Sequence, residues 1–371
     1  MRVTIDIQAA ITQRAGVGRY TKALVEHLGA AAGSDELALF YFDFQRRGMP
    51  FPVPGASTKA IRWCPGRVVQ KAWKTFQWPP FDWFAGAADV YHFPNFIRPP
   101  LSRGRSVVTV HDVSFLRHPD TTEPRNLRYL AAQIRNTVDR ADAIITDSAF
   151  AAREIEELFK TPAGKVTPIL LGLEPSITRP SADVIAATRR ALGLERPYLL
   201  MVSTIEPRKN IAFLVEVFEQ MEKFDGDLVI AGARGWKFEP IFERIAASKR
   251  AARIRHVDYV ADAQLPALYA GADLFLFPSR YEGFGFPPLE AMACGTPVVS
   301  SRGGSLPEVL GDAAEYVEAF DARAWADRAM KLLGDGTLRA ARVRQGLERA
   351  RAFSWDEAAR QTWAVYRRVA G

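Results

Sequence analysis

Cysteine is scarce in this chain, and long apolar runs, internal repeats and low-complexity segments are missing. The two cysteines, Cys64 and Cys294, lie far apart in the sequence, so neither a disulfide framework nor a zinc ribbon is available. No apolar stretch approaches the roughly 20 residues of a transmembrane helix. With 48% hydrophobic and 25% charged residues, the composition is that of an ordered chain and excludes disorder and collagen-like repeats. A reducing, cytosolic compartment is expected.

Metal-ligating patterns are missing as well. The five histidines show no metal-ligand spacing. The only Asp-x-Asp run, Asp225-Gly226-Asp227, precedes a predicted strand and has the composition of a turn. We therefore expect no metal ion and no other cofactor.

Length and charge bear on the number of domains and on the kind of partner. A chain of 371 residues exceeds the roughly 250–300 residues of one hydrophobic core, which predicts two domains. The net charge of +7 suits an anionic partner such as a nucleotide, a diphosphate, an acidic lipid surface or nucleic acid, although a well-solvated basic surface explains it equally. Residues 1–7 place Asp6 within a short apolar run, so we expect a first strand there and not a signal peptide.

Short apolar runs alternate with longer amphipathic stretches, which is typical of βα units around a parallel sheet. In the first half we expect helices at residues 17–29 and 150–158, and strands at residues 3–7, 37–42, 89–93, 106–110, 143–146 and 166–170. In the second half we expect strands at residues 198–203, 227–231, 254–257, 274–278 and 297–300, and helices at residues 211–221, 240–248, 263–270 and 288–294. Helical stretches continue from residue 322 to residue 370, with a break at residues 353–355.

The alternation breaks around residues 171–190, where prolines interrupt it before a helical run, and this predicts a domain boundary. We expect a Rossmann-like acceptor-binding domain at residues 1–178, a Rossmann-like nucleotide-sugar-binding domain at residues 179–352, and a C-terminal helix at residues 353–371 that returns to the first domain. Two doubly wound α/β domains are expected to face one another across a cleft, with a ligand outside the carboxyl ends of their strands.

The most informative segment is residues 278–299, where a strand, a glycine-rich loop and a helix follow one another. Pro288 fits the first turn of a helix, and the free N–H groups of such a loop and helix start make a surface for anions and hydroxyls. Glu282 lies on the loop and Glu290 at the helix start, where a carboxylate can accept bonds from ribose hydroxyls. Taken singly, Glu290 is more simply a residue that stabilises the helix dipole.

Two further places carry candidate residues. Arg208 and Lys209 follow the first strand of the second half, and a guanidinium beside an ammonium suits a diphosphate, although an isolated Arg-Lys pair is usually a solvated turn. In the first half, Gly16 and Gly18 open a helix in a glycine-rich turn that is not a full dinucleotide fingerprint. His111 ends a predicted strand, where it is equally suited to contact a substrate or to be a satisfied buried side chain.

Together these segments resemble the retaining, nucleotide-sugar-dependent glycosyltransferases of family four, which have the GT-B fold. The resemblance covers essentially the whole chain, to the closing Phe-Ser-Trp at residues 353–355. Its most specific element is the pair Glu282 and Glu290 beside the Gly-Phe-Gly of residues 283–285. Residues 206–210 (Glu-Pro-Arg-Lys-Asn) and 95–100 (Asn-Phe-Ile-Arg-Pro-Pro) look most like bacterial mannosyltransferases of lipopolysaccharide and exopolysaccharide assembly. Residues 302–305 fall in a stretch that varies among relatives, and no role is carried over to them.

The resemblance implies roles by position. Arg208 and Lys209 would hold the donor diphosphate and Glu290 the ribose. Glu282, with the amides of Gly285 and Phe286, would hold the donor sugar, and His111 would contact that sugar near its anomeric carbon. The implied catalytic residues are thus His111, Glu282, Arg208 and Lys209. The further donor-binding positions are Gly16, Gly18, Val260, Gly285, Phe286 and Leu289, with residues 257–260 expected beside the base.

The same resemblance implies transfer of a hexose, most simply mannose from GDP-mannose, with retention, to a lipid-linked or oligosaccharide acceptor in cell-surface polysaccharide assembly. The departing diphosphate is an anion, which Arg208, Lys209 and the helix start would stabilise without a metal. The alternatives are a GT-B glycoside phosphorylase that uses orthophosphate and a basic nucleic-acid-binding protein. No helix-turn-helix, zinc-finger or RNP-type motif supports the second alternative.

Residues 63–84 form a basic, aromatic stretch. This mixture suits the interface of an anionic membrane, but core tryptophans with snorkelling cations give the same pattern. The lipid-linked acceptors of the family favour peripheral contact with the inner face of the cytoplasmic membrane. The residues concerned are Trp63, Arg67, Lys71, Trp73, Lys74, Phe76, Trp78, Trp83 and Phe84.

Overall fold

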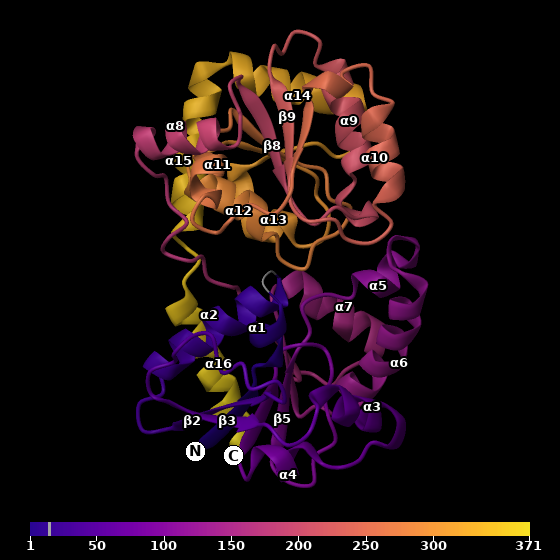
Figure 1. The fold of residues 1–371 in the computed structure, drawn as a ribbon, viewed down its shortest axis with the longest axis vertical. Coiled ribbons are helices and arrows are strands. Elements are labelled where there is room, and N and C mark those ends of the chain that lie inside the picture. The colour runs from indigo at the N-terminus through magenta and orange to yellow at the C-terminus, as the bar shows by residue number, and fades with distance from the viewer. Residues whose placement is uncertain (14–15) are drawn as a thin grey trace. The chain divides into compact units, whose positions relative to one another are not determined.

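Figure 1 shows the computed structural model of the chain, which describes residues 1–13 and 16–371, with the backbone only at residues 125 and 126. The chain divides into two compact units. Unit 1 contains Met1–Val113, Arg128–Gly172 and Ser354–Gly371, and unit 2 contains Ser114–Leu127 and Leu173–Phe353. The sequence had placed the breaks at residues 178 and 352 and did not anticipate that residues 114–127 group with unit 2.

Unit 1 is built on a seven-stranded parallel sheet with the order β3-β2-β1-β4-β5-β6-β7. Its central strands are buried on both faces, as expected of a parallel sheet covered by helices, and this is why they appear as continuous apolar runs. The strands are β1 (Arg2–Asp6), β2 (Glu36–Phe42), β3 (Ala56–Ile61), β4 (Val90–Phe93), β5 (Arg105–Thr109), β6 (Ala143–Thr146) and β7 (Val166–Pro168).

The helices of unit 1 pack around this sheet (Figure 1). They are α1 (Gln8–Thr12), α2 (Val17–Ala30), α3 (Gly66–Phe76), α4 (Phe81–Ala85), most of α6 (Pro124–Arg140), α7 (Ala149–Phe159) and α16 (Trp355–Ala370). Helix α16 joins the core of this unit although it comes last in the sequence. Trp363 and Tyr366 are fully buried, the indole of Trp363 donates to the Leu28 carbonyl (3.1 Å), and the Tyr366 hydroxyl is 2.7 Å from Nδ1 of His92.

Unit 2 contains a six-stranded parallel sheet with the order β10-β9-β8-β11-β12-β13. Its strands are β8 (Tyr198–Val202), β9 (Asp227–Ala231), β10 (Ile254–Val257), β11 (Leu274–Phe277), β12 (Val298–Ser300) and β13 (Glu315–Tyr316). The strand order reverses between β8 and β11, and the loops that follow these two strands therefore leave the sheet at its switch point, where doubly wound folds bind ligands.

The helical elements of unit 2 cover this second sheet. The α-helices are α5 (Ser114–Arg117), α8 (Ala182–Ala191), α9 (Ile211–Gln220), α10 (Glu239–Ala246), α11 (Leu265–Ala270), α12 (Phe286–Ala293), α13 (Leu306–Leu310), α14 (Ala322–Gly334) and α15 (Gly336–Ala350). The 3₁₀ turns are η1 (Pro119–Thr121), η2 (Pro207–Lys209), η3 (Ala251–Arg253) and η4 (Gly311–Ala313). Residues 114–127 are tied to the rest of unit 2 by the indole of Trp236, which donates to the Thr121 carbonyl at 2.7 Å.

The sequence predicted most of these elements to within a few residues. It missed β3, whose side chains are mostly exposed and polar, because an edge strand carries no apolar alternation. It also missed the helices before residue 149 other than α2. Among the described residues, no helix has the length and hydropathy needed to span a bilayer.

Residues 63–84 divide between core and surface. Trp73 and Phe84 are buried, and the indole of Trp73 donates to the Pro79 carbonyl at 2.6 Å. Other members of the stretch point into solvent, with exposed fractions between 58% and 75%: they are Trp63, Val68, Phe76, Trp78 and Trp83. The interpretation as core tryptophan therefore holds for Trp73, whereas membrane contact stays a prediction for the exposed side chains.

Candidate functional site

The loop after β8 carries the first group of site residues. It turns through η2 and Asn210, whose positive φ of 59° begins α9. Within this turn Glu206 and Lys209 are buried, and the side chain of Arg208 is only 15% exposed. The alternative of a solvated basic turn is therefore wrong.

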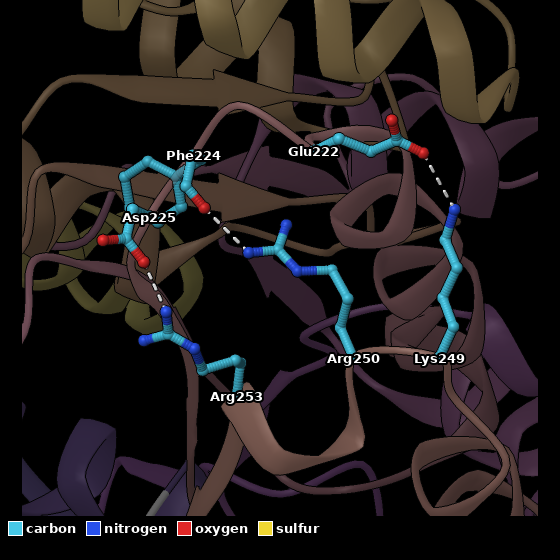
Figure 2. Close-up of a pocket in the computed structure, with 6 residues that line it drawn as sticks. All are labelled: Glu222, Phe224, Asp225, Lys249, Arg250 and Arg253. Atoms are coloured by element: carbon cyan, nitrogen blue, oxygen red, sulfur yellow. Dashed lines mark hydrogen bonds and ion pairs between the residues drawn. The ribbon is translucent and has the colours of Figure 1, made fainter.

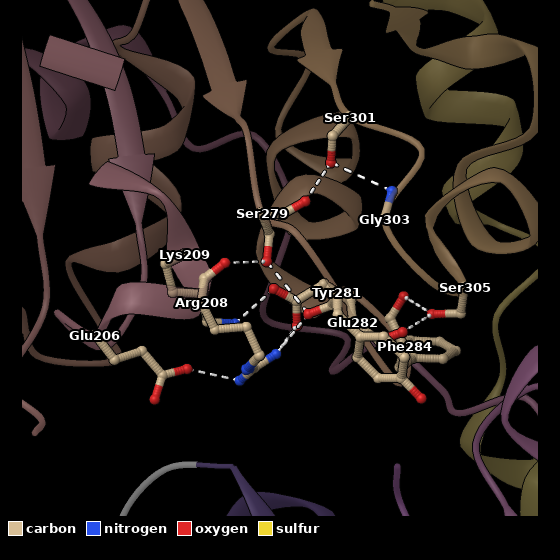
Figure 3. Close-up of polar contacts among 10 residues, drawn as sticks. All are labelled: Glu206, Arg208, Lys209, Ser279, Tyr281, Glu282, Phe284, Ser301, Gly303 and Ser305. Atoms are coloured by element: carbon tan, nitrogen blue, oxygen red, sulfur yellow. Dashed lines mark hydrogen bonds and ion pairs between the residues drawn. The ribbon is translucent and has the colours of Figure 1, made fainter. Parts of the chain in front are cut away.

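Arg208 and Lys209 form an ion-pair cluster with two glutamates (Figure 3). Nζ of Lys209 donates to Oε1 of Glu282 at 2.6 Å, and Nη1 of Arg208 donates to Oε2 of the same carboxylate at 3.2 Å. Nη2 of Arg208 donates to Oε1 of Glu206 at 2.7 Å. The Arg208 guanidinium thus lies between two carboxylates, and Nη1 also donates to the Tyr281 carbonyl at 2.6 Å.

The two carboxylates of this cluster differ. Burial would raise the pKa of Glu282, but Lys209 and Arg208 outweigh burial and hold this pKa below its usual range. For Glu206, burial dominates and raises its pKa, although Arg208 and Lys209 act in the opposite direction. Oε2 of Glu206 and Oγ of Ser203 are both buried without a hydrogen-bond partner. Glu282 is accordingly a stable anion, and Glu206 is an incompletely satisfied one.

Glu282 lies on the glycine-rich loop that leads from β11 into α12. Gly285 is the N-cap of α12 and has a φ of 109°, and a Cβ there would come within 2.7 Å of the Leu306 side chain. Glycine is therefore required both by backbone conformation and by space. Phe286 opens the helix, and the two prolines that follow it have no N–H, so the donors that this helix start can offer are the amides of Gly285 and Phe286.

Residues 301–305, to which the sequence analysis assigned no role, support this loop from behind. Oγ of Ser305 donates to the carbonyls of Glu282 (3.0 Å) and Phe284 (2.9 Å), and Ser301 donates to the Ser279 carbonyl at 2.5 Å (Figure 3). A Cβ on Gly304 would come within 2.2 Å of the Glu282 carbonyl oxygen. These contacts fix the path of the loop that presents the Glu282 carboxylate.

Glu290 lies in the second turn of α12 and is 1% exposed. One of its oxygens, Oε2, accepts a hydrogen bond from the Tyr269 hydroxyl at 2.8 Å. An exposed dipole-stabilising carboxylate would not be buried in this way, so that simpler interpretation does not account for Glu290. Leu289 and Val260 are buried in the same unit, and no contact tests their expected place beside the nucleotide.

Unit 1 carries the remaining predicted residues. Nδ1 of His111 is 2.8 Å from Oδ2 of Asp147, and Nε2 is 3.0 Å from the Pro94 carbonyl oxygen. Burial alone would lower the pKa of His111, but Asp147 raises it, and a ring that carries both hydrogens satisfies both acceptors. Oδ1 of Asp147 is buried without a partner. The sequence did not predict this pair, because the two residues lie 36 positions apart and carry no shared motif.

Gly16 and Gly18 lie at the start of α2. Gly16 is the N-cap of the helix with a φ of 55°, and a Cβ on Gly18 would come within 2.0 Å of the Gln13 carbonyl oxygen. Both positions therefore require glycine. Arg14 and Ala15 of the same predicted turn lie outside the described residues.

Two other charged places in unit 2 are structural. Asp225 and Asp227 both pair with the guanidinium of Arg253. The sequence predicted a turn for the whole Asp-x-Asp run, but Asp227 is the first residue of β9. A pocket of about 500 Å³ lies beside them and is lined by Glu222, Phe224, Asp225, Lys249, Arg250 and Arg253 (Figure 2). Arg250 donates to the carbonyls of residues 218, 221 and 224, where it caps the end of α9, and Lys249 pairs with Glu222. Within the described residues, no three His, Cys, Asp or Glu side chains are arranged to hold a metal ion.

In chemical terms, unit 2 presents two buried cations and a helix start at the switch point of a parallel sheet. A guanidinium, an ammonium and free amide N–H groups suit a phosphate or diphosphate.

Comparison with known proteins shows which family the chain resembles. Residues 14–177 match the family model described as Glycosyltransferase Family 4, and residues 185–349 match the one described as Glycosyl transferases group 1. The chain is 32% identical over 375 residues to the O-antigen chain mannosyltransferase B of Escherichia coli. The aligned region covers 95% of this chain and 96% of that protein.

Solved structures share the fold. The sucrose-phosphate synthase of Thermosynechococcus elongatus covers 100% of this chain and 99% of its own, with a TM-score of 0.77 and 21% identity. Anabaena HepE in complex with UDP and glucose covers 98% of this chain and 99% of its own, with a TM-score of 0.74 and 18% identity. These likenesses, the two parallel α/β units and the matched families lead to one conclusion: the chain belongs to the family-four glycosyltransferases and has the GT-B fold.

Proposed function

We propose that this glycosyltransferase transfers mannose from GDP-mannose, with retention of configuration, to a lipid-linked or oligosaccharide acceptor in cell-surface polysaccharide assembly. The observation that carries the proposal is the buried cluster of Arg208, Lys209 and Glu282 at the switch point of unit 2. The mannosyl donor and the polysaccharide acceptor are supported by the 32% identity to the O-antigen chain mannosyltransferase.

The chemistry of the transfer fits this cluster. As the glycosidic bond breaks, negative charge grows on the departing diphosphate and the sugar gains positive charge. Arg208, Lys209 and the amides of Gly285 and Phe286 would stabilise the departing anion, and cations already held in place do so without reorganisation during the reaction. This accounts for turnover without a divalent metal, which stays a prediction.

The other residues take the roles that remain. Glu282 would lie beside the donor sugar, and the Glu290 carboxylate, which accepts from the Tyr269 hydroxyl, would accept from a ribose hydroxyl of the donor. His111, held by Asp147 and the Pro94 carbonyl, would contact the sugar as a cation. For His111 this requires the hydrogen bond to Pro94 to be exchanged for one to the substrate.

A binding panel tests the donor. We expect GDP-mannose and GDP to raise the melting temperature most, with smaller shifts for UDP-glucose, UDP and ADP-glucose. A ligand at one hundred times its dissociation constant stabilises the native state by about 2.7 kcal/mol. A larger shift with UDP-glucose would overturn the choice of GDP-mannose.

A transfer assay tests the reaction. Radiolabelled GDP-mannose is incubated with membrane lipid extract or with mannose oligosaccharides, and the anomeric configuration of the product is read by NMR. The expected product carries an α-mannosyl linkage and forms equally in EDTA. Release of mannose 1-phosphate from an oligosaccharide with orthophosphate, and no use of GDP-mannose, would identify a phosphorylase instead.

We further propose that the exposed part of residues 63–84 contacts an anionic membrane. The rings of Trp78 and Trp83 pack edge to face with their centroids 5.8 Å apart, and both are more than half exposed. The exposed side chains of Arg67 and Lys71 lie on the same stretch, on α3. Aromatic rings at the interface with cations on the headgroups are a known combination for peripheral binding. The site of action would then be the inner face of the cytoplasmic membrane.

Vesicle sedimentation tests this contact. We expect the protein to bind vesicles with 30% phosphatidylglycerol more tightly than pure phosphatidylcholine vesicles, at about 1 kcal/mol for each basic residue near the surface. The double variant Trp78→Ser, Trp83→Ser should bind weakly while GDP-mannose still binds. Equal sedimentation of the variant and the wild type would remove the contact without affecting the donor assignment.

A further inference from the structure

We propose that Glu206 is a positioning residue for Arg208 and that its carboxylate takes up one proton from solvent when the diphosphate of the donor binds. The inference rests on the proposed function, because it takes the Arg208–Lys209 cluster to be the diphosphate site. It concerns a residue to which the sequence assigned no role.

The first step concerns the net charge of the cluster, which bears on how it can bind an anion. The cluster holds two cations, Arg208 and Lys209, and two carboxylates, Glu206 and Glu282, all joined by contacts of 2.6 to 3.2 Å. With both carboxylates ionised, the cluster has no net charge. A diphosphate brings about two negative charges into the same buried place, where an uncompensated charge is costly. Neutralising one carboxylate leaves a net positive charge for the incoming anion.

The second step identifies which carboxylate takes the proton. Both oxygens of Glu282 accept hydrogen bonds from cations, so protonation there would break an ion pair. Glu206 accepts from Arg208 through Oε1 only, and its Oε2 is buried without a partner. A proton on Oε2 therefore removes a buried charge and keeps the bond that holds the guanidinium in place.

The third step concerns the surroundings of Glu206. The charged groups that act on it are Arg208 and Lys209, which stabilise its anion, and Glu282, which opposes it. Residues 233–235 pack against the turn through backbone bonds to Ile205, but the guanidinium of Arg234 lies over the Phe242 ring at 4.6 Å and not on Glu206. Burial already raises the pKa of Glu206, and the negative charge of a bound diphosphate raises this pKa further.

Calorimetry counts the proton. GDP-mannose is titrated into the protein near pH 7.5 in buffers with different ionisation enthalpies, and the slope of the observed enthalpy against the buffer enthalpy gives the protons taken up. The diphosphate diester of GDP-mannose does not titrate near this pH, whereas the terminal phosphate of GDP would. We expect a slope of about one proton for the wild type. The dissociation constant should also rise up to about tenfold per pH unit above neutrality, since a proton is consumed on binding.

Two variants assign the proton to Glu206. In Glu206→Gln the amide replaces the protonated carboxyl, so GDP-mannose should still bind, with a slope near zero and an affinity independent of pH. The matched control is Glu219→Gln, which removes a carboxylate that also pairs with an arginine, Arg244, outside the cluster. This control should keep the wild-type slope.

The possible results distinguish failure of the role of Glu206 from failure of the proposed function. Binding of GDP-mannose to the wild type with no proton uptake overturns the role of Glu206 and leaves the proposed function intact, whether or not the variants fold. An unchanged slope in Glu206→Gln also overturns it, because another group then takes the proton. If neither GDP-mannose nor any other nucleotide sugar binds, both the proposed function and this inference fail.

Discussion

In the loops around Arg208 and Glu282, charged side chains are buried, whereas in residues 63–84 large apolar side chains are exposed. Both arrangements depart from the usual distribution of side chains in a folded protein, in which charged groups are rarely buried without partners and large exposed apolar patches signal an interface. The first costs desolvation energy and is maintained by ion pairs. The second leaves apolar surface in water, and packing within the chain does not explain it. Buried, paired charges are what a site for an anionic ligand needs, and exposed apolar rings are what contact with an external apolar surface needs.

The largest effect is expected where a buried cation is removed. Arg208→Ala should lower kcat by about 10²–10³, because a preorganised donor to the departing anion is lost. Added Mn²⁺ should not restore activity, and EDTA should not lower that of the wild type. Arg244→Ala, which breaks an arginine–glutamate pair outside the cluster, is the control and should keep kcat. Near-normal turnover of Arg208→Ala on protein shown to be folded would contradict the assignment.

The two tryptophan environments within residues 63–84 give the next test. Trp73→Ala should lower the free energy of unfolding by about 3–5 kcal/mol, since it removes a buried indole from a packed core. Trp83→Ala, at a side chain that is 60% exposed, should change it by less than about 0.5 kcal/mol. Urea denaturation measures both. A large loss of stability in Trp83→Ala would mean that this ring supports the fold, and would contradict the distinction between the buried and the exposed tryptophans.

The two glutamates of the glycine-rich segment should differ in kinetics. Glu290→Gln should raise the KM for the donor roughly tenfold with a smaller change in kcat, because a ribose contact is made equally in the ground state and the transition state. Glu282→Gln should lower kcat with little change in KM, because charge on the sugar and diphosphate develops only as the bond breaks. Steady-state kinetics with GDP-mannose decide this, and identical behaviour of the two variants would refute the division of roles.

The smallest effect concerns stability and pH. The folded-state pKa of Glu282 lies below its unfolded value, so its ionised form contributes stability above the unfolded pKa of about 4.3, and this contribution is lost as the pH falls through the folded pKa. In Glu282→Gln the stability should therefore fall less steeply on acidification. Glu206 has the opposite shift, so the contribution of its protonated form is lost as the pH rises through its folded pKa. Urea midpoints measured from neutral to acidic pH give both slopes. A steeper loss of stability on acidification in Glu282→Gln than in the wild type would contradict the role given to the Glu282 carboxylate.

The parallel strands and the site loops were the most predictable parts of this molecule. Strands such as β9 and β11 are buried on both faces and appear as unbroken apolar runs, and the glycine-rich turn after β11 is a local signal. The edge strand β3 was missed because its polar side chains carry no such signal. Short helices near prolines, such as α4, were missed because they lack the length over which helical periodicity can be recognised.

The partners of the site residues could not be predicted. That Glu282 pairs with both Arg208 and Lys209 depends on two loops that are more than seventy residues apart in the sequence and meet only because β8 and β11 are neighbours in the sheet. The same holds for His111 and Asp147, which follow the neighbouring strands β5 and β6. Residue type and spacing gave the candidate side chains, whereas their pairing depends on strand order.

Helix α16 has a consequence for how the protein is made. Trp363 and Tyr366 fill the interior of unit 1, yet residues 173–353, nearly all of unit 2, are synthesised before them. At about 5–20 residues per second, the ribosome needs on the order of 10–40 s to travel from residue 172 to residue 354. Throughout that interval the nascent unit 1 lacks part of its hydrophobic interior, and His92 lacks the hydroxyl that it contacts in the finished protein. Unit 2, whose sequence is complete by residue 353, can therefore reach its folded state first, and during translation unit 1 is the part of the chain that most needs chaperone protection.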